Sequence, residues 1–140
     1  MGVGYKGVGK RRKMALGTAI TAAKTQSTPT DLRGCKNVNF LHIVTSCAGG
    51  ADTADAKVQG SFDKSTWFDW VTFTQQSAAA NEAKAPTLAD SPMPRWARVV
   101  LTPGAGATIT SEVWMIYERA GDGSMPPTAS GLTTPTGTVA

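Results

Sequence analysis

Few residues in this 140-residue sequence could support catalysis or bind a metal, and they are widely spaced. The single histidine, His42, lies in an apolar segment with no nucleophile at a recognisable spacing. We therefore expect a packed or interface side chain rather than a general base. Two cysteines and one histidine supply three candidate metal ligands, none of them in a CxxC or HxxxH arrangement. No metal, and no other cofactor, is predicted.

Asp63 and Asp69 are the one pair of carboxylates whose placement suggests glycoside cleavage. Asp63 opens the turn-type sequence Asp63-Lys64-Ser65-Thr66, and Asp69 falls in an alternating strand-like segment. We interpret them as a turn residue and an exposed strand residue. Glycines 2, 4, 7 and 9 follow no strand and open no helix, so they do not form a phosphate-binding loop. The sequence therefore predicts a protein without enzymatic activity.

Cys35 and Cys47 stand at the two ends of one strand-like segment. If residues 37–45 are extended, the ends of this segment, beyond which the two cysteines lie, are about 30 Å apart at about 3.3 Å per residue. A disulfide requires Cα atoms within roughly 7 Å of each other. We expect two free thiols, which fits a reducing compartment.

Positive charge is concentrated at the N-terminus, where residues 1–13 hold five of the fourteen basic residues and no acidic one. The high isoelectric point therefore belongs to this segment and not to a domain face for nucleic acid, so no specific nucleic-acid binding is predicted. We expect residues 1–13 to form a flexible arm whose cations contact a partner. These candidate contact residues are Lys6, Lys10, Arg11, Arg12 and Lys13.

No run of 18 apolar residues is present, so no membrane span is predicted. The basic residues 10–13 followed by residues 14–20 imitate a secretion signal only weakly, because Gly17, Thr18 and Thr21 interrupt the apolar part.

Alternation of apolar and polar residues predicts an all-β fold with five strands. Residues 54–62 and 67–74 are expected to form one hairpin, and residues 95–102 and 108–118 a second. Residues 37–45 are apolar on both faces, which places this strand inside the domain. Residues 14–24 are compatible with a strand or a short helix.

A long polar segment, residues 75–94, is expected to be a contact-making loop, with a short helix over 77–85 as an alternative. We predict a single-domain β-sandwich or jelly roll over residues 14–119. Residues 120–140 are rich in glycine, proline and threonine, and we expect them to form a flexible tail.

Four tryptophans, at positions 67, 70, 96 and 114, fall on the predicted strands. Such rings either fill the core or form an exposed platform that stacks on sugars. Strict alternation puts Trp67 and Trp70 on opposite faces, so at least one of them should be exposed or at an interface. Trp70 is the aromatic residue that we expect to contact a partner.

The segment from Val58 to Trp70 combines a strand, a Gly-Ser-Phe-Asp turn and a tryptophan-bearing return strand. Residues 94–101, followed by a glycine-rich turn, repeat that layout. In this layout, residues 30–119 resemble small β-sandwich virion proteins of tailed bacteriophages. The similarity is greatest to capsid decoration, or cementing, proteins such as that of short-tailed Bordetella phages.

The resemblance implies a non-enzymatic structural protein of the virion exterior, made in the host cytoplasm. It would bind across junctions between major capsid protein subunits, as a dimer or trimer on the capsid surface. No contact residue can be transferred from the family, because no invariant binding motif is matched. A carbohydrate-binding or adhesive module, and a neck or tail structural protein, are the alternatives.

Overall fold

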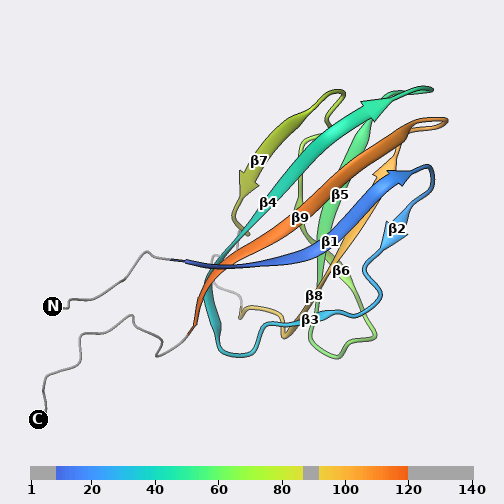
Figure 1. Ribbon diagram of the computed structural model, residues 1–140. Helices are drawn as coiled ribbons and strands as arrows, with labels where there is room; N and C mark the ends of the chain where they lie inside the picture. The colour runs from blue at the N-terminus through green and yellow to red at the C-terminus, as the bar shows by residue number, and fades with distance from the viewer. Residues whose placement is uncertain (1–8, 87–91, 120–140) are drawn as a thin grey trace, which may run out of the picture.

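The computed structural model describes residues 9–86 and 92–119, which form strands and turns without a helix (Figure 1). Two antiparallel sheets are present, one with the order β1-β9-β4-β7 and the other with the order β2-β8-β5-β6. We call them the β4 sheet and the β5 sheet, after one interior strand of each. The strands are β1 (Lys10–Ile20), β2 (Lys24–Thr25), β3 (Thr30–Asp31), β4 (Cys35–Ala48), β5 (Ala54–Ser61), β6 (Phe68–Thr72), β7 (Ala80–Lys84), β8 (Trp96–Pro103) and β9 (Thr108–Arg119).

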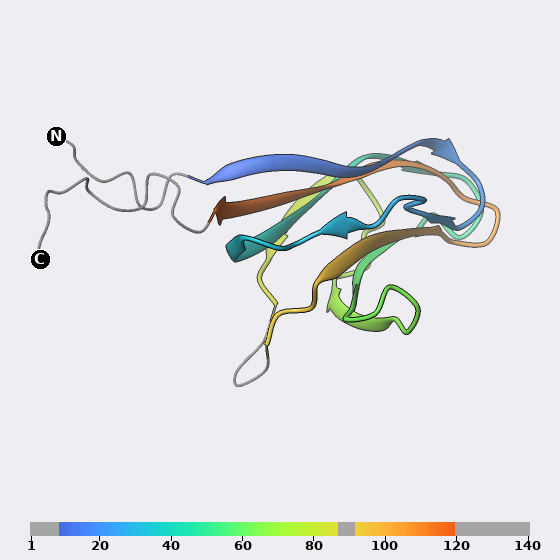
Figure 2. The same cartoon turned by 90° about the horizontal axis from the view of Figure 1, so that it is seen from below.

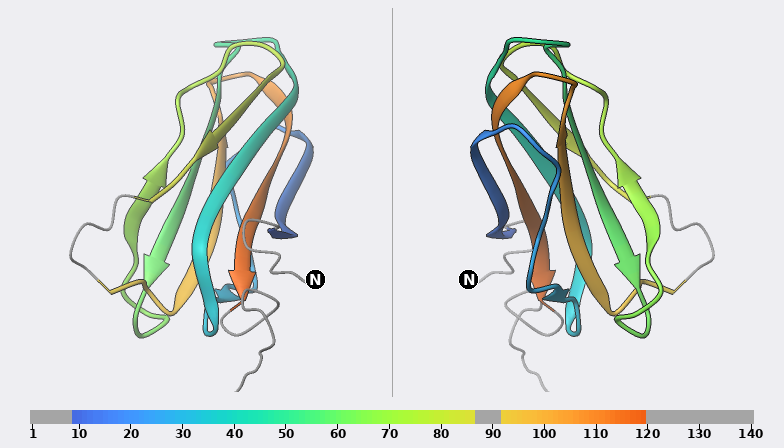
Figure 3. Two further views of the ribbon diagram at one scale, coloured as in Figure 1. Left: turned by 90° about the vertical axis from the view of Figure 1, so that its left-hand side faces the viewer. Right: turned by 90° about the vertical axis from the view of Figure 1, so that its right-hand side faces the viewer.

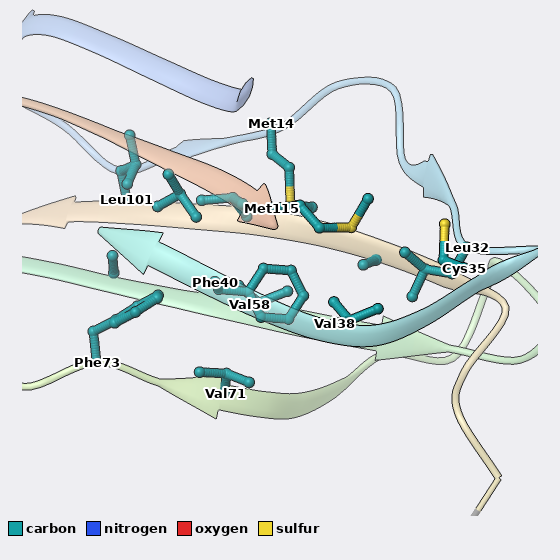
Figure 4. Close-up of a cluster of buried hydrophobic side chains, with 14 residues drawn as sticks. Met14, Leu32, Cys35, Val38, Phe40, Val58, Val71, Phe73, Leu101 and Met115 are labelled. Atoms are coloured by element: carbon teal, nitrogen blue, oxygen red, sulfur yellow. The ribbon is translucent and has the colours of Figure 1, made fainter. Parts of the chain in front are cut away.

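The two sheets pack face to face, which confirms the predicted β-sandwich (Figures 2 and 3). Alternation along each strand sends one set of side chains between the sheets, as β5 illustrates with Ala56 and Val58 buried and Lys57 and Gln59 more exposed. The central part of the core lies around Phe40 (Figure 4). Its labelled members are Met14, Leu32, Cys35, Val38, Phe40, Val58, Val71, Phe73, Leu101 and Met115.

One predicted hairpin is confirmed and the other is wrong. β5 and β6 pair as an antiparallel hairpin. β8 and β9 do not pair with each other: β8 pairs with β5, β2 and β3, whereas β9 pairs with β1 and β4. The connection over residues 104–107 therefore crosses from one sheet to the other. Alternation alone does not distinguish a hairpin from such a crossing, because both place one apolar face on the core.

The crossing from β8 to β9 is held by the loop that joins β4 to β5. Ala51 N–H donates to the Ala105 carbonyl at 2.7 Å, and Gly104 N–H donates to the Thr53 carbonyl at 2.8 Å. Gly50 has a φ of +47°, and a Cβ at this position would overlap the backbone of Ala105 and Gly106. Glycine is required here because the two loops approach backbone to backbone.

The N-terminal boundary and the long polar segment both differ from expectation. β1 begins at Lys10, so the predicted arm over residues 1–13 overlaps a paired strand by four residues. Residues 14–20 are strand and not helix, and the segment predicted as a loop or short helix contains β7, which pairs with β4. Residues 1–8 and the predicted tail over 120–140 lie outside the described residues.

Replacing Phe40 by alanine should lower the free energy of unfolding by about 3–5 kcal/mol, because the ring is fully buried between the sheets. Urea denaturation followed by tryptophan fluorescence would measure the loss. Leu41→Ala is the matched control, since Leu41 is the next residue on β4 and points away from the core. Equal losses for the two variants would contradict the arrangement of β4.

Candidate protein-binding surface

The outer face of the β4 sheet carries apolar side chains in rows across three strands, β1, β9 and β4. Leu41 on β4 lies opposite Trp114 on β9, and Trp114 lies opposite Lys13 on β1. Directly opposed residues of an antiparallel sheet point to the same side, so each row forms continuous surface. We call this surface the Trp114 face; its members are Arg11, Lys13, Leu16, Leu41, Ile43, Glu112, Trp114 and Ile116.

Cations from β1 lie over the tryptophan at the middle of this face. The Lys13 Nζ atom is 5.2 Å, and the Arg11 Cζ atom 5.5 Å, from the centroid of the Trp114 ring. Lys13 also forms an ion pair with Glu112, with 3.2 Å between Nζ and Oε1. The indole is thus held between strands by cation–π contacts, with positive charge on one side of it.

Half-exposed apolar residues make this face unusual for a sandwich. Strands that are apolar on both faces are ordinarily covered on both faces. β4 has Phe40 and Val44 on its inner face, and Leu41 and Ile43 on its outer face. The β5 sheet covers the inner set, whereas the described residues place no further layer over the outer set, and Leu16 on β1 is 44% exposed. An apolar centre with an aromatic residue and cations beside it has the composition of a protein-binding surface.

The basic residues predicted to form one arm lie on different sides of β1 in the structure. Arg11 and Lys13 lie on the Trp114 face, whereas Arg12 points to the opposite side of β1. Lys10 begins the strand opposite Tyr117, and Lys6 lies outside the described residues. The alternation of a strand separates neighbouring cations in this way, which a flexible arm would not do.

Trp70, the aromatic residue predicted to contact a partner, lies elsewhere. β6 has an irregularity at this point: Asp69 pairs with Gln59 and Val71 with Val58, which leaves Trp70 as an extra residue between them. A bulge of this kind re-aims the side chain that it carries. The half-buried ring packs edge-on against Phe40 with 5.6 Å between centroids, so Trp70 supports the core. Trp67 lies on the outer side beneath Arg98, so the two rings are on opposite faces as predicted, but Trp70 is the inward one and its predicted partner contact is wrong.

Sequence reasoning missed Trp114 as the aromatic residue next to the cations. Two signals were present: residues 37–45 are apolar on both faces, and alternation over 108–118 puts Trp114 and Ile116 on one side. Neither signal identifies β1 as the neighbour of β9, because that pairing joins residues about a hundred positions apart.

The outer face of the β5 sheet holds two further tryptophans, each beneath a cation. The Arg98 Cζ atom is 4.2 Å from the centroid of Trp67, and the Lys64 Nζ atom is 4.5 Å from that of Trp96. Arg98 also donates from Nε to the Gln59 side-chain oxygen at 2.8 Å. Arg95 also lies over Trp96, so a sugar ring stacking on these indoles would have to displace three cations, which disfavours the carbohydrate-binding alternative.

Asp63 and Asp69 have the surroundings of structural residues. Asp63 Oδ1 accepts hydrogen bonds from the backbone N–H groups of Thr66 at 2.7 Å and Ser65 at 2.8 Å, which lower the pKa of its carboxyl to about 2. Asp69 accepts from Gln59 at 3.0 Å and pairs with Lys57 at 3.1 Å. These contacts also lower the pKa of Asp69, so both carboxyls stay ionised and neither suits proton donation.

His42 is buried between the sheets, with its ring 5.3 Å from that of Phe73 and neither ring nitrogen hydrogen-bonded in the structure. Burial lowers the pKa of this imidazole, with Glu82 and Asp55 opposing the shift. The two cysteines are free thiols near the two ends of β4, as their spacing predicted. No group of three or more histidine, cysteine or acidic side chains in the described part of the chain could hold a metal ion.

No protein-family model matches this sequence, and no curated protein matches it. Within residues 9–86 and 92–119 there is no helix with the length and apolar character needed to span a membrane.

His42 should make stability dependent on pH below about 7. Because its pKa is lowered on folding from the usual 6.5, the unfolded chain binds the proton more readily. The contribution to stability is therefore complete about one pH unit above 6.5 and is lost as the pH falls through this value, by up to about 1.4 kcal/mol per pH unit. Urea midpoints at pH 7.5 and 5.0 would measure the fall. His42→Leu should remove it, and an unchanged pH dependence in that variant would refute the assignment.

Proposed function

We propose that this chain is a non-enzymatic structural protein of a tailed-phage virion that decorates and cements the capsid. It attaches through the Trp114 face to a junction between major capsid protein subunits. The observation that carries the proposal is the apolar outer face of β4, with Leu41 and Ile43 beside Trp114. Burying these apolar side chains against a partner is favourable, because it removes their surface from water.

The strand order supports this class of protein. If β2 and β3 are counted as one interrupted strand along β8, each sheet has four antiparallel strands. Successive segments cross between the sheets, except for the β5–β6 hairpin and the step from β2 to β3. We propose that this is a jelly roll, an architecture found in viral capsid domains and lectins. The architecture also serves other functions, so the choice between them rests on the Trp114 face.

The charges around the face indicate the chemistry of the partner. Arg11 and Lys13 lie on one side of Trp114, and the nearby carboxylate of Glu112 on the same face is already paired with Lys13. A complementary surface would have an apolar centre with acidic side chains along one edge. We therefore propose an acidic rim on the capsid site. Many copies on a lattice would make a weak single contact sufficient through avidity.

Trp114→Ala should weaken attachment to capsids that lack the protein by about thirtyfold or more, as for a central aromatic contact worth about 2 kcal/mol. Co-sedimentation of purified protein with capsids of the phage that encodes it would give the dissociation constant. Trp67→Ala is the matched control, because Trp67 also lies beneath an arginine but is on the outer face of the β5 sheet, on the opposite side of the sandwich. It should leave capsid binding unchanged. Equal binding by the Trp114→Ala variant and the unmodified protein would exclude this face.

Self-association through the same face is the competing outcome. Sedimentation equilibrium in the absence of capsids distinguishes it, since a concentration-dependent dimer that Trp114→Ala disrupts would assign the face to a second copy of the chain. The dimer or trimer expected from the family resemblance would instead persist in that variant.

Replacing Arg11 and Lys13 together by glutamine should weaken capsid binding at low salt and reduce its salt dependence. Exposed charges separated from a partner by solvent are screened above about 0.1 M salt, where the Debye length is about 10 Å. Titrations at several salt concentrations would measure the slope. An unchanged slope would show that these cations do not face an acidic rim. A deletion of residues 1–8 tests the preceding segment separately, because it leaves β1 complete.

A further inference from the structure

A polar pocket with a volume of about 270 Å³ opens at the end of the sandwich where β1 begins and β9 ends. Three arginines line it: Arg12 from β1, Arg33 from the β3–β4 connection and Arg119 from the end of β9. Tyr117 supplies a phenol to the same lining. We call it the arginine pocket. It is separate from the Trp114 face.

The register explains why arginines point to the inner side of a sheet here. Arg12 lies opposite Met115, and Arg119 lies opposite Cys35. Met115 and Cys35 are buried, and directly opposed residues share a face. Arg12 and Arg119 thus take inward positions at the end of the β4 sheet, yet both are exposed to solvent.

Negative charge in the arginine pocket is limited to Asp31, and that carboxylate has other partners. Its oxygens lie 3.4 Å from Nη2 of Arg33 and 3.5 Å from Nε of Arg95, and Oδ1 also accepts the Arg33 backbone N–H at 2.9 Å. No carboxylate in the described part of the chain forms an ion pair with Arg12 or Arg119. The lining therefore has an excess of guanidinium groups over carboxylates.

The cysteine in the lining does not offset this excess. Burial raises the pKa of the Cys35 thiol, with Arg119 acting in the opposite direction. The thiol therefore stays protonated near neutral pH and, although Arg119 contacts it, carries no charge that would neutralise a guanidinium group. Each guanidinium presents five N–H donors in a planar fork, which suits oxyanions that accept from several directions.

We propose that the arginine pocket binds a tetrahedral oxyanion: a phosphate group, either free or carried by a small molecule. Arg12 and Arg119 donate to it directly, Tyr117 adds a hydroxyl donor, and Arg33 contributes charge while it remains paired with Asp31. Phosphate is favoured over a monocarboxylate because its oxygens can accept from several guanidinium groups at once. The proposal does not depend on capsid binding, since it concerns the inner side of the sheet.

Isothermal titration calorimetry of the full chain with inorganic phosphate at pH 7.5, at constant ionic strength, tests the proposal. We expect saturable binding at one site per chain, with Arg12→Gln and Arg119→Gln each weakening it by about tenfold or more. Arg11→Gln is the matched control, because Arg11 neighbours Arg12 on β1 but lies on the outer face. It should leave phosphate binding unchanged.

Equal weakening by Arg11→Gln and Arg12→Gln would overturn the site in favour of general attraction to a basic strand. Heat no different from that of added chloride, or acetate binding as tightly as phosphate, would also overturn it. Glycerol 2-phosphate distinguishes the sources: binding of both ligands supports a phosphate group carried by a small molecule, and binding of inorganic phosphate alone supports the free ion. Urea unfolding of each variant verifies that the fold is retained.

Discussion

The pairing of β4 with β9 is the contact on which the rest of the structure depends. It runs from Cys35 opposite Arg119 to Ala48 opposite Thr108 and joins the two longest strands. Its register puts Phe40 and Met115 on the inner side. A slip of one residue would move that apolar set to the other side of the sheet, so burial of the core selects the register strongly. The same register decides which side chains remain outside.

That constraint leaves an apolar surface that the sandwich does not use. Leu41, Ile43 and Trp114 lie on the outer side because their neighbours on the same strands occupy the core. β1 then adds cations along one edge of the sheet. Charged edge strands also discourage pairing with the strands of other chains, so the basic run protects the edge of this sheet. Lys13 is part of that edge, pairs with Glu112 and lies over the Trp114 ring.

The arginine pocket arises from the same alternation at the other side of β1. Arg11 and Arg12 are neighbours in the sequence, yet one lies over Trp114 and the other lines the pocket with Arg119. The consecutive basic residues 10–13 thus contribute to two surfaces of different chemistry. One is a cation–π surface with an apolar centre, and the other is a cluster of guanidinium groups around a polar pocket.

The sequence by itself determined five of the strands (β4, β5, β6, β8 and β9), the sandwich class, the β5–β6 hairpin and the free thiols, because these follow from local alternation, turn residues and spacing. Only the tertiary structure decided that β8 and β9 belong to different sheets and that β1 pairs with β9, because a strand's pattern records burial and not the identity of its neighbour. It also decided the role of Trp70, since the bulge at that residue shifts the alternation from which an exposed ring was predicted. Residues 10–13 were predicted to be an arm because their charges indicate exposure to solvent. An edge strand is exposed as well, so charge alone does not distinguish it from an arm.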